Sequence, residues 1–325
     1  MAFNKSLRQI AGSVATACVA TGVLAQTVYP TKPVRIVVPY SAGGPADIYA
    51  RFIGDRVQKT LGQPFVIENR PGAGAIIGTD AVAKSAPDGY TLLMMSNTHT
   101  VNESLFTKKP YSLMRDLAPI SPINYSDLLL VVHPSVPANN LKELIALAES
   151  RPGALNYASS GPGTPYHMAG ELFKAMAGID VVHVPHKGSA EARTSVLAGD
   201  VQMMFDAITT MASLAQSGKV RAIATSGKIR SSITPGVPTL DEAGLPGYDA
   251  VIWLGMMAPT ATPKPIVDSL NSEIQKIANL PDVKEAWAKQ GAVPMRMTPT
   301  EFGKFLERDI QKWAKVVKFS GAKVD

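Results

Sequence analysis

The sequence contains a single cysteine among 325 residues, Cys18, and only five histidines. Cys18 lies in an N-terminal segment that we expect to be removed, so the mature chain has no thiol for catalysis, disulfide bonds or zinc binding. Aromatic residues make up 6% of the chain, charged residues 18% and hydrophobic residues 46%. This composition excludes a disordered or fibrous protein, and the length suffices for two lobes that each bury a core.

Charge of one sign is not concentrated anywhere in the sequence. The chain carries 32 Lys+Arg against 26 Asp+Glu, a formal net charge of +6. It has no basic run interleaved with aromatics and no zinc-finger or RNA-binding signature, so we expect no nucleic-acid partner. The one close histidine pair, His183 and His186, is a poor metal site because the strand period turns the two side chains to opposite faces. We expect no metal and no cofactor.

The first 25 residues differ from the rest and have the features of a secretory signal peptide. Lys5 and Arg8 form a positive region, residues 10–24 are uncharged, and Ala25 ends a small-residue cleavage motif. The alternatives are a retained membrane anchor, for which the segment is short and poorly hydrophobic, and a lipoprotein modified at Cys18, for which the usual leucine is missing. The sequence therefore predicts export to the periplasm through a cleaved signal peptide.

From residue 26 onward, apolar strand-like runs alternate with segments of helical periodicity, joined by Gly, Pro, Ser or Asn. The first part predicts strands at 34–40, 64–68 and 90–95 and helices at 46–61 and 76–84. A middle part predicts strands at 128–132, 155–158, 181–184, 201–205 and 220–224 and helices near 140–150, 165–177, 189–198 and 209–217. From residue 253 the patterns are mainly helical, at 266–278, 283–290 and 300–319.

Continuous apolar strands between helices indicate an α/β fold with mainly parallel sheets covered on both faces. Two Pro-punctuated stretches, 118–123 and 235–247, are candidate crossings between lobes. We therefore predict one lobe from residues 26–126 plus 249–325, which we name lobe 1, and a second from residues 127–248, which we name lobe 2. This arrangement places a ligand cleft between the lobes.

Two strand-to-helix loops contain the most informative residues, because ligands of open α/β sheets bind at the carboxyl ends of strands, where helix N-termini point. The first loop consists of Tyr40, Ser41, Ala42, Gly43, Gly44, Pro45, Ala46 and Asp47, and the second of Ser159, Ser160, Gly161, Pro162, Gly163, Thr164, Pro165, Tyr166 and His167. Glycines let backbone N–H groups approach a ligand closely, and a helix dipole favours an anion there. Facing loops of this kind predict a cradle for a carboxylate.

Enzyme motifs are missing from the sequence. Residues 72–78 follow a strand and open a helix, but their spacing is Gly-x-Gly-x-x-x-Gly, and the end of the next strand lacks the acidic residue that binds a ribose. No phosphate-binding loop and no Gly-x-Ser-x-Gly nucleophile elbow is present. The sequence therefore favours a binding protein over an enzyme.

A series of short motifs spans the mature chain in order. They lie at 33–40 with Gly43, Gly44 and Asp47, then at 68–74, 87–91, 157–167, 184–185 with 187–188, Trp253 with Gly255, and 258–259. Together they resemble the tripartite tricarboxylate transporter receptor family, the Bug-type extracytoplasmic solute-binding proteins. The resemblance implies a type II periplasmic binding protein fold, whose hinged lobes close on a small carboxylate and deliver it to membrane transporter subunits. Receptors of this type are usually monomers, so we expect a monomer.

The resemblance also assigns site residues. It implies that backbone amides and bridging waters of the two loops hold one carboxylate, and it adds as wall positions Asn97, Thr98, His99, Lys187, Gly188 and Asp206. Pro45 departs from the hydroxyl residue of many members, and His186 stands where a tyrosine is usual, which makes His186 a specificity candidate. From the residues alone, Asp47 is equally consistent with a helix cap, His167 with a satisfied helix histidine, and Lys187 with a solvated turn residue.

The sequence thus predicts a periplasmic receptor that binds a small carboxylate between its lobes and presents it to a transporter. The polar Asn97, Thr98, His186 and Lys187 favour a diacid, but aromatic and aliphatic diacids, citrate and monoacids such as nicotinate all stay open. The alternative functions are a receptor domain that reports ligand binding to a sensor kinase and a secreted enzyme on the same fold.

Overall fold

Strands and helices alternate along the chain as the hydrophobic pattern predicts. The computed structural model describes residues 29–320, and the predicted signal peptide lies outside them. The first part consists of β1 (Val34–Val38), α1 (Pro45–Leu61), β2 (Phe65–Asn69), α2 (Ile76–Ala83), β3 (Thr91–Ser96), α3 (Asn97–Leu105) and α4 (Leu113–Asp116).

The strand β4 (Leu117–Val132) leads from this part into the middle of the chain. The middle consists of α5 (Leu141–Ser150), β5 (Asn156–Ser159), α6 (Pro165–Ala177), β6 (Val182–Pro185), α7 (Ser189–Ala198), β7 (Met203–Ala207), α8 (Ile208–Gln216) and β8 (Arg221–Thr225). The chain returns through β9 (Val251–Pro259) and ends with α9 (Lys264–Ala278), α10 (Pro281–Ala288), β10 (Ala292–Pro294) and α11 (Pro299–Ser320).

The strands join into one hydrogen-bonded network with the order β2-β1-β3-β9-β4-β7-β5-β6, to which β8 and β10 add by pairing with β4. β1 is parallel to β2 and β3, and β5 is parallel to β6 and β7. Every pair that includes β4 or β9 is antiparallel. The predicted parallel pairing within each lobe is therefore confirmed, and the antiparallel pairs come from the two strands that connect the lobes.

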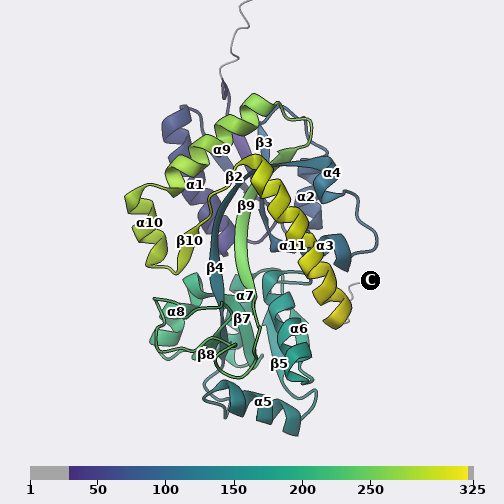
Figure 1. Ribbon diagram of the computed structural model, residues 1–325, viewed down its shortest axis with the longest axis vertical. Coiled ribbons are helices and arrows are strands. Elements are labelled where there is room, and N and C mark those ends of the chain that lie inside the picture. Colours follow the sequence, from purple (N-terminus) through teal and green to yellow (C-terminus); the bar gives the residue numbers. More distant parts are fainter. Residues whose placement is uncertain (1–28, 321–325) are drawn as a thin grey trace, which may run out of the picture.

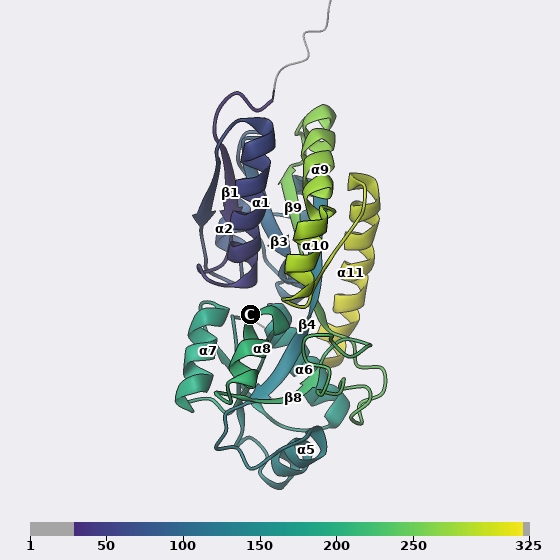
Figure 2. The ribbon, with the colours of Figure 1, turned by 90° about the vertical axis from the view of Figure 1, so that its left-hand side faces the viewer.

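Two long strands run through both halves of the molecule (Figures 1 and 2). β4 pairs with β9 from Leu117 opposite Pro259 to Asp127 opposite Val251. The stretch 118–123 is thus a crossing, as predicted, but it crosses as a strand. The strand accommodates Pro119 and Pro122 because the register shifts directly after each of them, and a bulge tolerates the missing N–H of proline.

The prediction that 235–247 forms the return crossing was wrong. Leu240 and Leu245 from this stretch are buried in the core of lobe 2, and Thr239 bridges to Thr225 at the end of β8. The return is β9 itself, an apolar run that the sequence pattern did not separate from the helical remainder. Turn-forming residues occur both in linkers between lobes and in surface loops, so their presence does not distinguish the two. A segment is a surface loop of one lobe when its apolar side chains pack into the core of that lobe.

The core of each lobe lies on both faces of its sheet. In lobe 2, Leu128, Leu130 and Val132 of β4 pack with α5 and α6, whereas Leu129 and Val131 pack with α7 and α8. This alternation follows from the period of two in a strand. In lobe 1, α1, α9 and α10 cover one face, and α2 and α11 cover the other.

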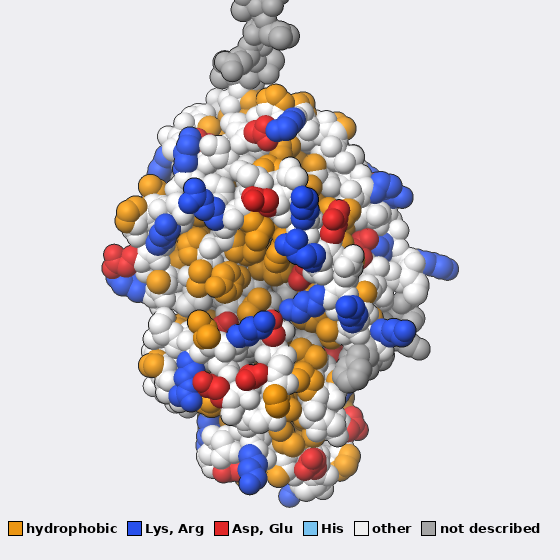
Figure 3. Space-filling view, viewed as in Figure 1, with side chains coloured by type: hydrophobic (Ala, Val, Ile, Leu, Met, Phe, Trp, Pro, Cys, Tyr) orange, Lys and Arg blue, Asp and Glu red, His pale blue; other side chains and the backbone are white. Residues whose placement is uncertain are grey.

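The C-terminal helix α11 belongs to lobe 1 by sequence but touches both lobes. It packs against α3 and α6, and Trp313 enters the core of lobe 2. Its outer side exposes Lys304, Arg308, Lys312 and Lys315, and basic side chains follow its course on the face shown in Figure 3. α11 therefore spans the side of the molecule where β4 and β9 cross.

Candidate functional site

A small cavity lies where the first loop of lobe 1 meets the starts of α6 and α7 in lobe 2. Its walls are formed by Tyr40, Ser41, Gly44, Pro45, Ala46, Ser96, Ser160, Pro165, Tyr166, Gly188, Ser189, Ile252 and Leu254. It encloses about 30 Å³. Since one water-sized group needs about 10–15 Å³ on this scale, the cavity has room for about two or three such groups. That space matches the three non-hydrogen atoms of a carboxylate.

The first loop presents the N-terminus of α1 to this cavity. Gly44 is the N-cap, Pro45 follows it, and no side chain caps the helix. Among the hydrogen bonds within residues 29–320, none is donated by the backbone N–H of Gly44 or Ala46. The first N–H groups of a helix have no intrahelical acceptor, so these two groups are available to an anion, which the helix dipole also favours.

Asp47 braces the first loop. Its Oδ2 accepts a hydrogen bond from the Gly43 N–H at 3.0 Å, and its Oδ1 accepts one from Arg51 at 3.0 Å. Burial raises the pKa of Asp47, but the bonds from Arg51 and Gly43 outweigh burial and hold the pKa below its ordinary value. The carboxylate is therefore ionised and already occupied, as expected for a group that fixes the loop.

Tyr40 closes the cavity from lobe 1. Its hydroxyl lies 2.7 Å from Ser96 Oγ, and Ser96 also caps α3 by accepting the N–H of Thr98. Burial raises the pKa of Tyr40 to about 12, so the phenol keeps its proton and can donate. Asn97 donates to the carbonyl of Val251 on β9 at 3.0 Å. Asn97 and Thr98 thus support the cavity wall from behind.

The second loop is held rigidly at the start of α6. Thr164 is the N-cap; its Oγ1 donates to the Gly161 carbonyl at 2.7 Å and accepts the His167 N–H at 3.4 Å. Ser160 belongs to this loop and lines both this cavity and a larger neighbouring one. The loop therefore presents a second helix N-terminus from the other lobe, as predicted.

Two histidines support the second loop through hydrogen bonds to its residues. His167 Nδ1 accepts the Gly163 N–H at 3.1 Å, and His183 Nε2 lies 2.6 Å from Ser159 Oγ. The two imidazole rings stack with centroids 4.1 Å apart, and Tyr157 stacks on His183 at 4.8 Å. Burial lowers the pKa of His167 to about 4 and that of His183 to about 3, so both are neutral near neutral pH. They support the loop through geometry and bring no charge to it.

A larger cavity adjoins the first and shares Tyr40 and Ser160 with it. Its walls are formed by Pro39, Tyr40, Pro71, Gly72, Ala73, Gly74, Ala75, Phe106, Ser160, Gly161, Pro162, Thr164, His186 and Lys187. It encloses about 560 Å³. Phe106 and the prolines make much of the wall apolar, while the half-buried His186 and the exposed Lys187 supply its ionisable groups. A ligand whose carboxylate occupies the small cavity has space for the rest of its structure here.

The two lobes touch beside the small cavity. Ser41 Oγ donates to the Lys187 carbonyl at 3.1 Å. A Cβ atom added at Gly188 would lie 2.9 Å from Ser41 Cβ, and one added at Gly44 would lie 3.1 Å from Ser189 Oγ. Gly44 has φ −88° and Gly188 has φ −177°, so neither backbone requires glycine. Their missing side chains instead allow the lobes to approach this closely.

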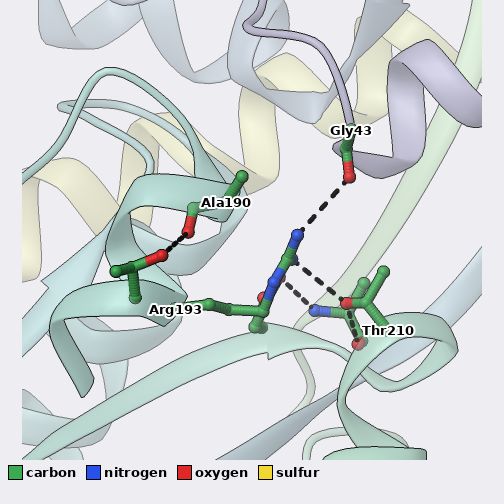
Figure 4. Close-up of polar contacts among 7 residues, drawn as sticks. Gly43, Ala190, Arg193 and Thr210 are labelled. Carbon is green, nitrogen blue, oxygen red and sulfur yellow. Dashed lines mark hydrogen bonds and ion pairs between the residues drawn. The ribbon is translucent and has the colours of Figure 1, made fainter. Parts of the chain in front are cut away.

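Asp206, expected as a wall residue, lies behind the cavity. It is fully buried, and its Oδ2 accepts a hydrogen bond from Arg193 at 2.7 Å. Burial raises the pKa of Asp206, and Arg193 opposes this rise. Arg193 also reaches the Gly43 carbonyl of lobe 1 at 3.4 Å, as Figure 4 shows.

The predicted residues thus divide into two groups. Those that line the cavities are Tyr40, Ser41, Gly44, Pro45, Ala46, Ser160, Gly161, Pro162, Thr164, Pro165, Tyr166, His186, Lys187 and Gly188. Those that line neither cavity among the described residues, and mostly brace the loops, are Ala42, Gly43, Asp47, Asn97, Thr98, His99, Ser159, Gly163, His167 and Asp206. Direct ligand contact by any of these residues stays a prediction.

Sequence reasoning missed several residues around the cavities. Ser96, Ser189, Ile252 and Leu254 line the small cavity, and Arg193 lies beside it. A signal for Ser189 was available, because it directly follows the Lys187-Gly188 turn and begins α7. Arg193 lies within a helix and gave no such signal.

Residues 29–320 contain neither a metal-binding cluster nor a membrane-spanning helix. No group of three or more His, Cys, Asp or Glu side chains is placed to hold a metal ion there. No helix in the same range is long and apolar enough to cross a membrane.

Known proteins resemble this chain over most of its length. Residues 49–321 match the family model described as the tripartite tricarboxylate transporter family receptor. Protein BugT of Bordetella pertussis is 39% identical over 326 residues, covering 100% of both chains. Among solved structures, R. palustris Rpa4515 with adipate has a TM-score of 0.88 and 34% identity, covering 90% of this chain and 98% of its own. MatC of Rhodopseudomonas palustris with bound malate has a TM-score of 0.85 and 34% identity, covering 89% and 100%.

Proposed function

Since this chain belongs to the tripartite tricarboxylate transporter receptor family, we propose that it binds a small carboxylate between its lobes in the periplasm and presents it to membrane transporter subunits. One observation carries the proposal. Helices from both lobes, α1 of lobe 1 and α6 of lobe 2, begin at the wall of the cavity of about 30 Å³. In the proposed site, α1 offers a carboxylate the N–H groups of Gly44 and Ala46, and α7 of lobe 2, which no side chain caps, offers its first N–H groups.

The energetics fit a small anion without a dedicated cation. Each helix N-terminus stabilises a negative charge by about 0.3–1 kcal/mol when exposed and by up to about 2 kcal/mol when partly buried. Arg193 is neutralised by Asp206, and Lys187 is exposed at the edge of the larger cavity. Because the ligand contacts both lobes, it stabilises the closed arrangement by its differential affinity, and the closed shape is what a membrane partner recognises.

A dicarboxylate fits the pair of cavities best. One carboxylate occupies the small cavity, and the remainder extends past Tyr40 and Ser160 into the space of about 560 Å³, where His186 and Lys187 can meet a second acid group. The solved relatives described above carry adipate and malate, both of which are small diacids. The size of the second cavity also accommodates a longer or aromatic diacid.

A thermal panel tests this function. The mature protein, residues 26–325, is melted with malate, adipate, succinate, citrate, terephthalate and nicotinate, each paired with its amide. A ligand at about one hundred times its Kd adds about 2.7 kcal/mol to the stability, which raises the Tm by a few degrees in a chain of this size. We expect a rise with at least one acid and none with its amide. No rise with any acid, together with no carboxylate in extracts of the denatured protein, would contradict the proposal.

Two further measurements separate this function from its alternatives. Deleting the gene should abolish uptake of the identified acid if the protein serves a transporter, whereas a sensor-kinase receptor would leave uptake intact and change gene expression. Incubating the acid with the protein and recovering it unchanged would argue against a secreted enzyme.

A further inference from the structure

Arg193 connects the two lobes through one guanidinium group. It lies on α7 of lobe 2, and its side chain is 14% exposed. One terminal nitrogen donates to Asp206 Oδ2 at 2.7 Å and approaches Thr210 Oγ1 at 3.4 Å. The other donates to the Gly43 carbonyl of lobe 1 at 3.4 Å (Figure 4). One side chain thus joins a buried anion of its own lobe to the backbone of the other.

The carboxylate of Asp206 fixes the direction of this side chain. Asp206 is fully buried on β7, and its second oxygen accepts the N–H of Ala207 at 2.8 Å, so the carboxylate has little freedom. A guanidinium group is planar, and its N–H groups point in fixed directions. Once Arg193 is bound to Asp206, its other N–H groups are therefore aimed outward, toward the first loop of lobe 1.

The carbonyl that accepts this bond belongs to the same peptide unit as the Gly44 N–H. In a trans peptide the C=O and N–H point in opposite directions, so holding the Gly43 oxygen toward Arg193 turns the Gly44 N–H away from it. A bond to the carbonyl also polarises the peptide and strengthens its N–H as a donor. Gly44 lines the small cavity, and its N–H has no acceptor within the described residues.

We propose that Arg193 is a positioning residue, which latches the first loop to lobe 2 when the lobes close and orients the Gly44 N–H toward the carboxylate. Its orienting role rests on the proposed function, whereas the latch itself concerns only the contact between the lobes. The bond to Gly43 forms only when the lobes touch, so it stabilises the closed arrangement selectively. Because Asp206 neutralises Arg193, the latch adds no net charge beside the ligand.

Two variants remove the latch in different ways. Arg193→Lys keeps the charge that Asp206 needs, but an ammonium group lacks the planar fork that binds Asp206 through one nitrogen and aims a second nitrogen at the Gly43 carbonyl. The double variant Arg193→Gln with Asp206→Asn replaces the ion pair by a neutral pair and leaves no buried charge unpaired. Arg221→Lys is the matched control, because Arg221 is also a partly buried arginine of lobe 2, and it donates to the Val136 and Ala138 carbonyls of the same lobe.

The readout is the distance between the lobes, measured by pulsed electron spin resonance. The cysteine-free mature chain takes spin labels at Thr60→Cys on α1 and Ala198→Cys on α7, both exposed. Distances are recorded without ligand and with excess adipate. We expect both latch variants to lower the closed-to-open ratio about tenfold, the effect of one charge-assisted hydrogen bond, and to release bound carboxylate faster with little change in its association rate. Arg221→Lys should keep the wild-type distances.

The distance measurements test the Arg193 latch independently of whether the protein binds a carboxylate. Wild-type distance distributions in both latch variants, or an equal shift in Arg221→Lys, would overturn it. If no carboxylate binds the wild-type protein, the proposed function fails, and the distances in the ligand-free protein still decide whether Arg193 latches the lobes. A lower Tm with unchanged distances would assign Arg193 a purely structural role within lobe 2 and would also overturn the proposal.

Discussion

Replacing Gly188 by alanine tests whether close approach of the lobes is required for binding. The added Cβ would lie 2.9 Å from Ser41 Cβ and 3.0 Å from Ser41 Oγ. Carbon atoms in contact normally lie about 3.5–4.0 Å apart, so the lobes must separate by roughly 0.6–1 Å at this point. That movement stretches the hydrogen bond from Ser41 to the Lys187 carbonyl, which is already 3.1 Å long. Loss of this bond costs about 1 kcal/mol, and overpacking costs about 1–3 kcal/mol in total.

The same change should leave the ligand-free fold almost untouched. Gly188 has an extended backbone, with φ −177°, which alanine also adopts. Alanine lowers the entropy of the unfolded chain, which stabilises the protein by about 0.4–1 kcal/mol, but it is a poorer N-cap for α7 than glycine, and the two effects roughly cancel. We therefore expect an affinity for the identified acid that is about tenfold weaker, with a ligand-free Tm close to that of the wild type.

Calorimetric titration and thermal melting measure the two quantities. Gly236→Ala is the control, because a Cβ atom there meets nothing within 4 Å. It should keep wild-type affinity. The reasoning would be refuted by wild-type affinity in Gly188→Ala, or by a loss of affinity that merely follows a fall in its ligand-free Tm.

Three further predictions concern the cradle and two buried ionisable groups. Gly44→Leu should abolish binding without unfolding, because its side chain would meet Ser189 at the cavity wall, and titration with circular dichroism checks both points. Burial, aided by Asp249, raises the pKa of Asp127 to about 6, so this carboxyl lowers stability progressively as pH rises from about 4 through 6. Asp127→Asn should therefore raise the unfolding free energy by roughly 2 kcal/mol near pH 8 and leave it unchanged near pH 4. Urea melts at both pH values measure this difference, and an equal effect of the substitution at the two pH values would contradict burial as the cause. His183 has a pKa lowered to about 3, so the wild type loses stability as pH falls below about 6.5; His183→Gln should flatten the Tm profile between about pH 6.5 and 4.5, and a parallel profile would contradict the assignment.

Local signals explain how much of the fold could be predicted. The expected helices at 165–177 and 189–198 are α6 and α7 residue for residue, because Pro165 opens the first and Gly178 and Gly199, both with positive φ, end the two helices. Such caps are readable without knowledge of the rest of the chain. β9 was missed because its identity as a strand depends on pairing with β3 and β4, and β4 lies more than a hundred residues earlier in the chain.

In the site, too, local features could be predicted from the sequence, whereas contacts between distant residues could not. The two glycine-rich loops were predicted because a strand, a tight turn and a helix start are all local features. The role of Asp47 was not decided, since a first-turn carboxylate serves equally as a brace or as a ligand contact until its partners, Gly43 and Arg51, are seen. The family resemblance placed Asp206 in the wall, but the arginine that binds it lies on α7, and no local feature of the sequence links the two residues.

The proposed site separates recognition of the carboxylate head from recognition of the rest of the acid. We propose that backbone N–H groups hold the head, and their direction depends on the path of the chain and on bracing groups such as Asp47, His167 and Arg193. The side chain of His186, which faces the larger cavity, is not needed for that bracing, because the hydrogen bonds that hold the two loops come from Asp47, His167 and Thr164. A substitution such as His186→Tyr should therefore change which acid is preferred while leaving the requirement for a carboxylate intact. If the variant bound the amide of a preferred acid as well as the acid itself, head and tail recognition would not be separate, and this account of the site would fail.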